Sequence, residues 1–364
     1  MPNYLLYSPA VETIESDEQE TFSKIVNLMT EGQNLTREKY GRPIRISHAK
    51  AHAILKGKLI VRDDLPAELA QGLFSKPGTY EILVRMASAP GELLDDSKVN
   101  STRGMAIKVF GVDGPKLAGH SGDTQDFVLA PGKEFIAGDA KAFLQAFKPN
   151  AEIAPKLSDT TKGVVSTLSR VTNEALNVVG INSAKLDFFG HPLLHPLGES
   201  QYSQTPFRYG EYVAKFGVIP NTPDLEALLK EKVDPQTPDA LRDECNAFLR
   251  AHPAEYSFQV QLNTNTDEMS IEDATKPWSE EDSQYQEVAR LIIPLQTAWD
   301  RERDSFVEPL SFSPDHSLEA HRPLGSVNRA RRVAYDALSQ VRRSESVNPM
   351  VEPRNAETLS ASQN

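Results

Sequence analysis

Short runs rich in Val, Ile and Phe, or with alternating apolar residues, recur along the chain and are bounded by Gly, Pro or Asp turns. Runs of this length and composition are typical of β-strands. They cover residues 44–54, 79–87, 104–112, 125–130, 210–219, 255–263 and 287–294. Many separated strands with helices inserted between them favour an antiparallel barrel with helices outside it. We therefore predict an α+β fold.

Helical patterns surround these runs. Residues 18–40 have apolar residues at helical spacing, so residues 1–40 are predicted to form an N-terminal arm with one helix. Further helices are expected over 139–180, with Lys162–Val179 the longest candidate, over Asp224–Arg250 as two short helices, and at about 327–343. The chain from Gln296 to that last helix is predicted to be mostly loop. We assign residues 41–345 to one domain and expect the polar tail, 346–364, to be mobile.

Composition limits the classes of partner. The formal net charge is −12 and the pI is about 5.3, which argues against nucleic acid or an anionic membrane surface as a partner. No apolar run approaches the ~18 residues of a membrane span. The single cysteine, Cys245, excludes an intramolecular disulfide and suits a reducing compartment. The N-terminus lacks the features of a signal peptide, so we expect a cytoplasmic protein.

The last predicted helix carries a tyrosine one turn after an arginine, in the sequence Arg331-Arg332-Val333-Ala334-Tyr335. Residues four apart lie on the same helical face, so the Arg331 guanidinium can favour the phenolate form of Tyr335. Phenolate is one of the few axial ligands of haem iron. Arg342 lies on the same face and could meet a haem carboxylate. The alternative is a basic amphipathic helix on which a tyrosine simply packs.

Three other segments strengthen the first interpretation. They are Arg45–Lys50 (sequence RISHAK), Val84–Ala87 (VRMA) and Arg103–Phe110 (RGMAIKVF). Together with the Arg331–Tyr335 motif, and in the same order, they resemble the distal-histidine strand, two barrel segments and proximal ligand motif of haem catalases. The resemblance covers residues 40–345. The chain is thus identified as a short member of the catalase-like haem protein superfamily, similar to small catalase-related peroxidases and to the coral allene oxide synthase.

This resemblance implies a catalase-type β-barrel that holds haem b and assembles as a homo-oligomer. It assigns Tyr335 as the axial ligand of the haem iron and Arg331 as its partner. It makes His48 the distal residue that moves protons during peroxide cleavage. Haem propionates would be bound by Arg45, Arg85 and Arg342, and an aromatic ring near the haem plane would be Phe143.

Two features of the distal segment stay open in the sequence. His52 would lie on the same face of a straight strand as His48, although the family pattern selects the histidine before Ala-Lys. Arg45 and His48 are separated by an odd number of residues, so a flat strand would send them to opposite faces. Both can reach one haem only if the strand twists or bulges.

The sequence also departs from true catalases. Ser47 replaces a residue that is commonly valine in catalases and threonine in the coral enzyme, and its hydroxyl could bond to His48 or to bound peroxide. Pro131 falls where catalases have a distal asparagine, and Ala87 falls where they have a serine. Fewer polar groups would then orient a second hydrogen peroxide molecule. We therefore predict weak catalase activity.

Three functions follow from these residues. The first is a haem peroxidase that uses hydrogen peroxide or an organic hydroperoxide and a small organic reductant, with His48 and Ser47 in the catalytic pocket. The second is a lyase or isomerase of fatty-acid hydroperoxides, motivated by Ser47. The third is a haem-binding protein without turnover. A metal site at His191 and His195 is disfavoured, because Pro192 and Pro196 break any helix there.

Overall fold

The computed structural model describes residues 3–152, 191–345 and 352–356. The predicted helix Lys162–Val179 lies outside these residues, as does most of the predicted tail. The described helices are α1 (Glu18–Tyr40), α2 (Ala140–Glu152), α5 (Pro223–Leu228), α6 (Ala240–Ala251), α7 (Arg301–Val307) and α8 (Ser326–Ser344). Short 3₁₀ helices are η1 (Pro9–Val11), η2 (Gly72–Phe74), η4 (Pro196–Gly198) and η5 (Glu319–His321).

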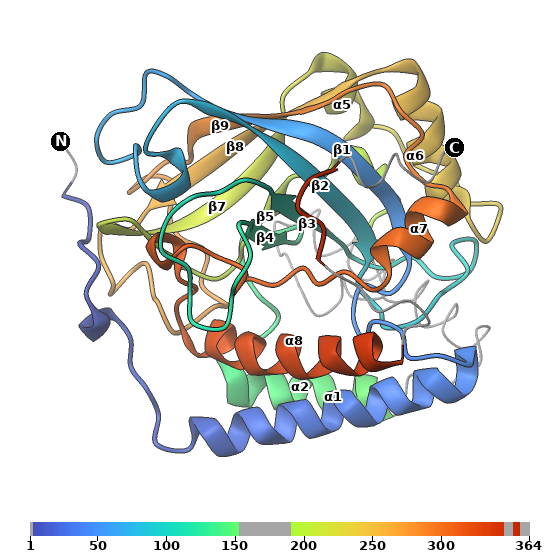
Figure 1. Cartoon of the computed structure of the whole chain (residues 1–364), viewed down its shortest axis with the longest axis horizontal. Coiled ribbons are helices and arrows are strands. Elements are labelled where there is room, and N and C mark those ends of the chain that lie inside the picture. Colours follow the sequence, from blue (N-terminus) through green and yellow to red (C-terminus); the bar gives the residue numbers. More distant parts are fainter. Residues whose placement is uncertain (1–2, 153–190, 346–351, 357–364) are drawn as a thin grey trace.

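The strands form one antiparallel sheet that curls into a barrel (Figure 1). They are β1 (Ala51–Val61), β2 (Gly78–Ser88), β3 (Arg103–Val109), β4 (Gln125–Leu129), β5 (Gln201–Tyr202), β6 (Phe207–Tyr209), β7 (Tyr212–Pro220), β8 (Ala254–Leu262) and β9 (Gln286–Ile293). Their order is β4-β3-β2-β1-β9-β8-β7-β5, and β6 pairs with β7. Ala130 and Tyr202 exchange backbone hydrogen bonds of 2.9 and 2.7 Å, which join the two ends of the sheet. The predicted α+β barrel is confirmed.

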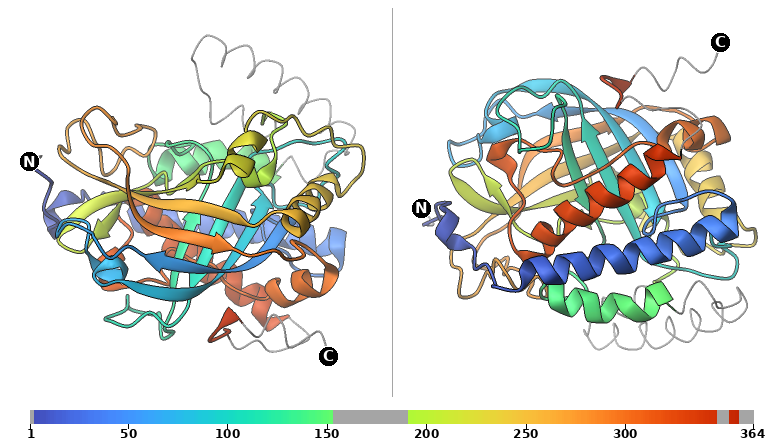
Figure 2. Two further views of the ribbon diagram at one scale, coloured as in Figure 1. Left: turned by 90° about the horizontal axis from the view of Figure 1, so that it is seen from above. Right: turned by 60° about the horizontal axis from the view of Figure 1, so that its bottom comes forward.

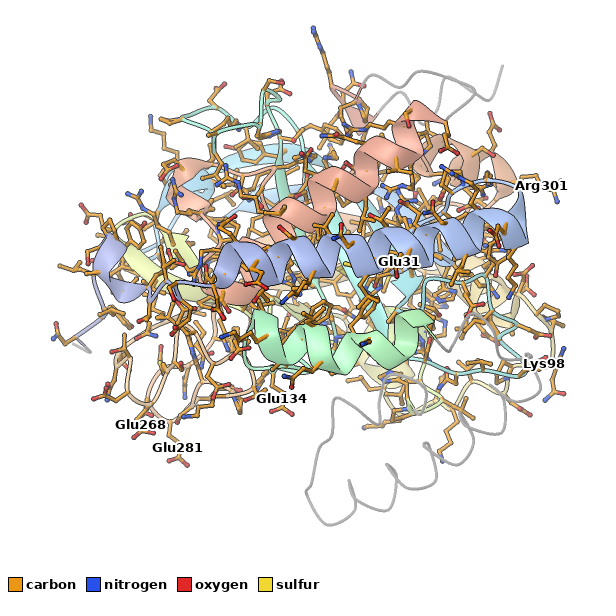
Figure 3. All side chains as sticks on the ribbon, turned by 90° about the horizontal axis from the view of Figure 1, so that it is seen from below. Glu31, Lys98, Glu134, Glu268, Glu281 and Arg301 are labelled. Atoms are coloured by element: carbon orange, nitrogen blue, oxygen red, sulfur yellow. The ribbon has the colours of Figure 1, made fainter. Side chains whose placement is uncertain are left out.

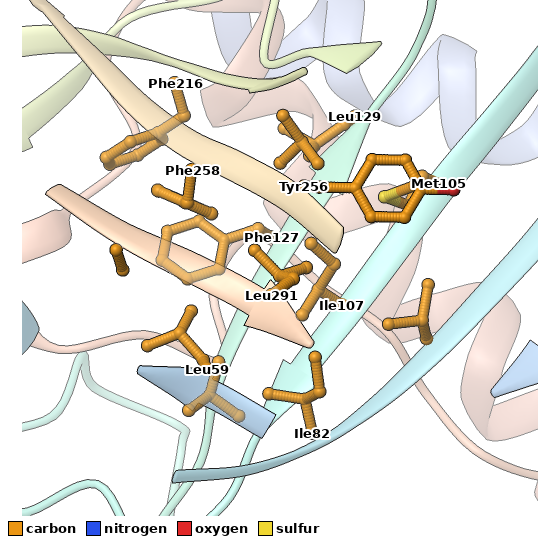
Figure 4. Close-up of a cluster of buried hydrophobic side chains, with 14 of the residues drawn as sticks. Leu59, Ile82, Met105, Ile107, Phe127, Leu129, Phe216, Tyr256, Phe258 and Leu291 are labelled. Atoms are coloured by element: carbon orange, nitrogen blue, oxygen red, sulfur yellow. The ribbon is translucent and has the colours of Figure 1, made fainter. Parts of the chain in front are cut away.

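Large apolar side chains fill the barrel interior (Figure 4). Phe127, Phe216 and Phe258 come from β4, β7 and β8, and their ring centroids lie 4.8–5.8 Å apart. Alternate residues of a strand point to the same face, so each strand contributes every second side chain to this core. The interior is therefore packed, and a ligand site has to lie outside the barrel.

Helices α1, α2 and α8 lie side by side beneath the barrel (Figures 1 and 2). Phe22, Ile25 and Met29 of α1 share an apolar cluster with Ala330 and Ala334 of α8. Figure 3 views this helical layer from below, with Glu31 on the outward face of α1. The layer covers one side of the barrel and encloses the space between the two.

Two segments differ from the prediction. The strand expected over 44–54 begins only at Ala51, because His48 adopts a left-handed backbone conformation (φ 56°) that interrupts an extended chain. The region after Gln296, predicted to be loop, contains α7. Asp300 caps this helix by accepting a hydrogen bond of 2.8 Å from the Arg303 amide, which stabilises a helix too short for its pattern to be recognised.

Candidate active site

Two adjoining cavities lie between the barrel and the helical layer, with volumes of about 590 and 110 Å³. Residues from α1, from the segment before β1, from β4 and from α8 line both of them. They include Met29, Ser47, His48, Leu129 and Tyr335. The fold thus brings His48 and Tyr335, which are far apart in the sequence, to the walls of one continuous space.

His48 is held in a defined orientation. Its backbone amide donates to the Ala89 carbonyl at 2.8 Å, and its ring Nδ1 lies 3.3 Å from the Ala87 carbonyl oxygen. Gly104 of β3 makes room for the ring, since a Cβ atom there would lie 2.6 Å from His48 Cε1. Burial, together with the nearby positive charge of Arg85, lowers the pKa of His48 to about 4. The imidazole is therefore neutral at physiological pH.

The left-handed turn at His48 also resolves the spacing problem in the sequence. Residues 45–50 are not a flat strand, so Arg45 and His48 both line the smaller cavity. His52 lies at a register shift between β1 and β2 and lines neither cavity. It is fully buried, and its Nε2 lies 2.7 Å from Ser88 Oγ. The structure thus places His48, and not His52, at the cavity wall.

Of the two partners that the sequence offered for the Ser47 hydroxyl, His48 or bound peroxide, the contact with His48 is not formed. The Ser47 hydroxyl donates to the Ala89 carbonyl at 3.0 Å, although the side chain does line both cavities. A hydroxyl has one hydrogen to donate, so once it donates to the backbone carbonyl it cannot also donate to the imidazole. The ring is restrained instead by Ala87, through its backbone oxygen. Sequence patterns carry no signal for such a contact.

Pro131 lines the larger cavity and, like its neighbour Ala130, has no side-chain amide. A different amide lies close by, which the sequence analysis missed. Gln204 lines the same cavity in a left-handed conformation (φ 61°), and its Nε2 donates to the Pro131 carbonyl at 3.1 Å. A non-glycine residue with positive φ is uncommon, so tertiary contacts hold Gln204 in the wall.

Arg331 and Tyr335 both lie on α8 and line the larger cavity. The Arg331 Nη1 group donates to Thr205 Oγ1 at 3.3 Å and to Asn328 Oδ1 at 3.2 Å. Its guanidinium lies 4.9 Å from the centre of the Phe135 ring. Burial lowers the pKa of Arg331, and the charge of the neighbouring Tyr335 opposes that shift. Thr205 and Asn328 were not predicted as site residues. Nothing in the spacing of Thr205 relates it to Tyr335, but Asn328 lies three residues before Arg331 on the same face of α8, a signal that was available in the sequence.

The three arginines predicted to bind carboxylates all line the smaller cavity. Arg45 pairs with Glu308 at 2.6 Å and donates to the carbonyls of Val307 and Leu310 at 2.9 and 2.8 Å. Arg85 donates to two backbone carbonyls of the His48 segment. Within the described part of the chain, the hydrogen bonds of Arg342 are long, 3.4 and 3.5 Å, and its buried Nε has no partner.

Positive charge exceeds negative charge in this part of the site. Burial lowers the pKa values of Arg85 and Arg342 to about 9, and the charge of Arg45 acts on both in the same direction. Glu308 is the carboxylate that pairs with Arg45 here. The described lining of the smaller cavity contains the buried Arg45 and Arg85 and the partly buried Arg342, but no carboxylate, which favours an anionic ligand there.

Phe143 of α2 also lines the larger cavity, and its ring lies 5.7 Å from Phe135 and 5.3 Å from Phe147. Two further histidines have protein partners; His191 also lines the larger cavity, whereas His195 lines neither cavity. His191 pairs with Glu199, and His195 Nδ1 accepts a hydrogen bond of 3.2 Å from the Leu197 amide. Phe143 is thus positioned to contact a flat ligand, whereas His191 and His195 serve local structure.

Comparison with known proteins supports the fold assignment. No protein-family model matches the sequence, and a search of curated proteins finds no significant match. Solved structures do match, among them three catalases. A fungal catalase is 18% identical, with a TM-score of 0.59, and the match covers 85% of this chain and 61% of that chain. Catalase A from Saccharomyces cerevisiae is 16% identical, with a TM-score of 0.59, and the match covers 89% of this chain and 66% of that chain. A bacterial catalase is 16% identical, with a TM-score of 0.57, and the match covers 88% of this chain and 61% of that chain.

These matches define the class: an antiparallel barrel with packed helices on one side, of the catalase type. This chain spans 61–66% of the length of those three proteins. Among the described residues, no helix is both long and apolar enough to cross a membrane.

Proposed function

We propose that this protein is a haem-dependent peroxidase that acts on hydrogen peroxide or organic hydroperoxides and has weak catalase activity. One observation carries the proposal: His48 and Tyr335 line the same cavity in a catalase fold, with Arg331 on the helix that bears the tyrosine. Haem peroxide chemistry requires a group that carries a proton and a ligand for the iron, and His48 and Tyr335 would supply these two groups in one space.

The residues present fit haem b. Tyr335 would be the axial ligand, as tyrosine is in catalases. The arginines of the smaller cavity give it a positive charge that suits the carboxylates of haem, and apolar residues of α1 and α2 line the adjoining larger cavity. When bound, haem would supply the redox-active iron at which the peroxide O–O bond is cleaved. Arg331, one helical turn before the ligand tyrosine, would place a positive charge beside it.

His48 would handle the proton. Its Nδ1 contact with the Ala87 carbonyl requires a proton on Nδ1, which leaves Nε2 of the neutral ring as a base. That nitrogen can accept a proton from the hydroperoxide hydroxyl and then return it to the departing oxygen. Because the pKa of His48 is about 4, the protonated ring is a strong acid and gives the proton back readily.

The walls of the larger cavity favour organic hydroperoxides. Ala130 and Pro131 of the larger cavity, and Ala87 of the smaller one, offer no side-chain hydrogen bond to a second hydrogen peroxide molecule, which catalase turnover has to orient. Apolar side chains surround the same space and suit an alkyl or aryl group; they include Ile25, Val128, Ile136, Phe147 and Pro277. An external reductant would then complete the cycle.

The direct test uses purified protein reconstituted with haem. Consumption of cumene hydroperoxide should depend on a phenolic reductant and should exceed oxygen release from hydrogen peroxide. Fast oxygen release would contradict the weak catalase activity. Conversion of a fatty-acid hydroperoxide without reductant would instead support the lyase or isomerase alternative, and failure to bind haem would overturn the proposal. The same preparation, analysed by light scattering, tests the predicted homo-oligomer.

A further inference from the structure

The three arginines of the smaller cavity have different partners. Arg45 is engaged by Glu308 and two carbonyls of the α7 end, and Arg342 is only loosely engaged. Arg85 alone contacts the distal segment: its Nη1 donates to the His48 carbonyl at 2.8 Å and its Nη2 to the Ala49 carbonyl at 3.0 Å. The side chain is 4% exposed, so water cannot readily replace these bonds.

We propose that Arg85 is a positioning residue, which clamps the backbone of His48 and thereby fixes the orientation of the imidazole. The proposal goes beyond carboxylate binding, the role that the sequence predicted for Arg85. It rests on the proposed function only where peroxide reactivity is concerned, because the clamp itself is formed by residues of this chain alone.

The backbone of His48 needs such a clamp. A φ of 56° is unfavourable for any residue with a side chain, so it persists only where surrounding contacts impose it. The planar fork of an arginine can hold two successive carbonyls at once, whereas a lysine offers a single point of charge. Arg85 is fixed in turn by its place in β2, where it pairs with Ile54 of β1 and Ala106 of β3.

Two further contacts depend on this conformation. The His48 ring reaches the Ala87 carbonyl and occupies the space left free by Gly104. Release of the clamp would let the backbone return to an extended conformation and would turn the ring out of that space. The arginine best placed to hold a carboxylate of haem is then Arg342, because its hydrogen bonds to described residues are long, whereas both Nη groups of Arg85 are engaged.

The test compares Arg85→Lys with Arg303→Lys. Arg303 is a matched control, because it also donates to a backbone carbonyl, that of Ile54 at 2.9 Å, but lines neither cavity. Arg85→Lys should lower the rate of reaction with peroxide by about 100-fold, the scale of a misplaced catalytic group. Its haem dissociation constant should change little, while Arg342→Lys should raise that constant by about tenfold, as the loss of one charged hydrogen bond does.

A measurement without haem separates the clamp from the proposed function. In ¹⁵N NMR of the cofactor-free protein, His48 should show one tautomer, with the proton on Nδ1. Arg85→Lys should give a mixture of tautomers, and Arg303→Lys should not. If Arg85→Lys does not fold, Arg85→Gln serves in its place, since its amide can reach only one carbonyl. An unchanged tautomer and an unchanged peroxide rate would overturn the clamp, whereas lack of haem binding by the wild type would overturn only the proposed function.

Discussion

The imidazole Nδ1 of His48 lies 3.3 Å from the carbonyl oxygen of Ala87. A carbonyl can only accept, so this contact assigns the ring proton to Nδ1 and leaves Nε2 as the basic nitrogen. The backbone carbonyl of Ala87 therefore orients the imidazole of His48, which the methyl side chain of Ala87 could not do because it makes no hydrogen bond. Tyr335 lines the same space from α8, so the base and the proposed iron ligand share one pocket.

Replacement of His48 by glutamine should lower the rate of reaction with cumene hydroperoxide by about 10²- to 10⁴-fold, the usual contribution of a general acid–base group. Haem binding should persist, because Tyr335 and the arginines are unchanged. Stopped-flow kinetics and haem titration measure the two effects. His252→Gln is the matched control, since that histidine is half exposed and pairs with Asp224 outside the cavities. A His48→Gln protein as reactive as the control would exclude His48 as the proton carrier.

The pH dependence of kcat/KM should reflect the low pKa of His48. Burial of the ring lowers this pKa from its usual value near 6.5 to about 4, so the ring stays neutral and able to accept a proton down to that pH. The rate should therefore be constant between pH 7 and 5 and should fall only as the pH approaches 4. A decline with a midpoint near pH 6.5 would show that the ring is solvated and that its proposed environment is wrong.

Gly104→Ala tests the fit between β3 and the distal ring. The new Cβ would lie 2.6 Å from His48 Cε1 and 2.9 Å from the Leu129 carbonyl oxygen, both closer than real contacts allow. Overpacking of this kind costs about 1–3 kcal/mol of the free energy of unfolding. Urea denaturation should show this loss, while Gly78→Ala, whose nearest contact is 3.3 Å from a flexible Tyr80 ring, should change little. Equal stabilities would mean that the ring lies elsewhere.

Acid should destabilise the protein through His321. This fully buried ring accepts a hydrogen bond of 2.9 Å from the Leu73 amide, and burial lowers its pKa to about 3. The unfolded histidine binds a proton near pH 6.5, so between pH 6.5 and 3 the unfolded state binds more protons and falling pH favours unfolding. Between pH 7 and pH 5 this difference in proton binding lowers the free energy of unfolding by about 2 kcal/mol. In urea denaturation at the two pH values, His321→Gln should lack this part of the decrease in the free energy of unfolding. An equal decrease in the wild type and in His321→Gln would contradict the role of His321.

The sequence was sufficient for the elements with strong local patterns. The barrel, α1, the two helices of Asp224–Arg250 and α8 follow from periodicity, and the segments around His48 and Tyr335 follow from their motifs. These features are local, because the signal lies within a few consecutive residues. The grouping of Arg45, Arg85 and Arg342 at one cavity likewise agrees with the motif comparison.

What the sequence missed depends on distant partners. The left-handed turn at His48 is imposed by Arg85 and Gly104, and it shortened the predicted first strand. Arg45 is paired with Glu308, a residue 263 positions away, and no local pattern relates the two. The hydroxyl of Ser47 selects a backbone carbonyl over the adjacent imidazole, a choice that only the folded geometry decides.

An optical titration of the cofactor-free protein with haem shows whether Tyr335 and His48 form a haem pocket. We expect stoichiometric binding with the absorption spectrum of ferric, tyrosine-ligated haem, and a spectral change on addition of one equivalent of cumene hydroperoxide. Tyr335→Phe should lose that spectrum and bind haem more weakly. A wild-type protein that takes up no haem, or a Tyr335→Phe protein with an unchanged spectrum, would rule out a haem pocket at these residues.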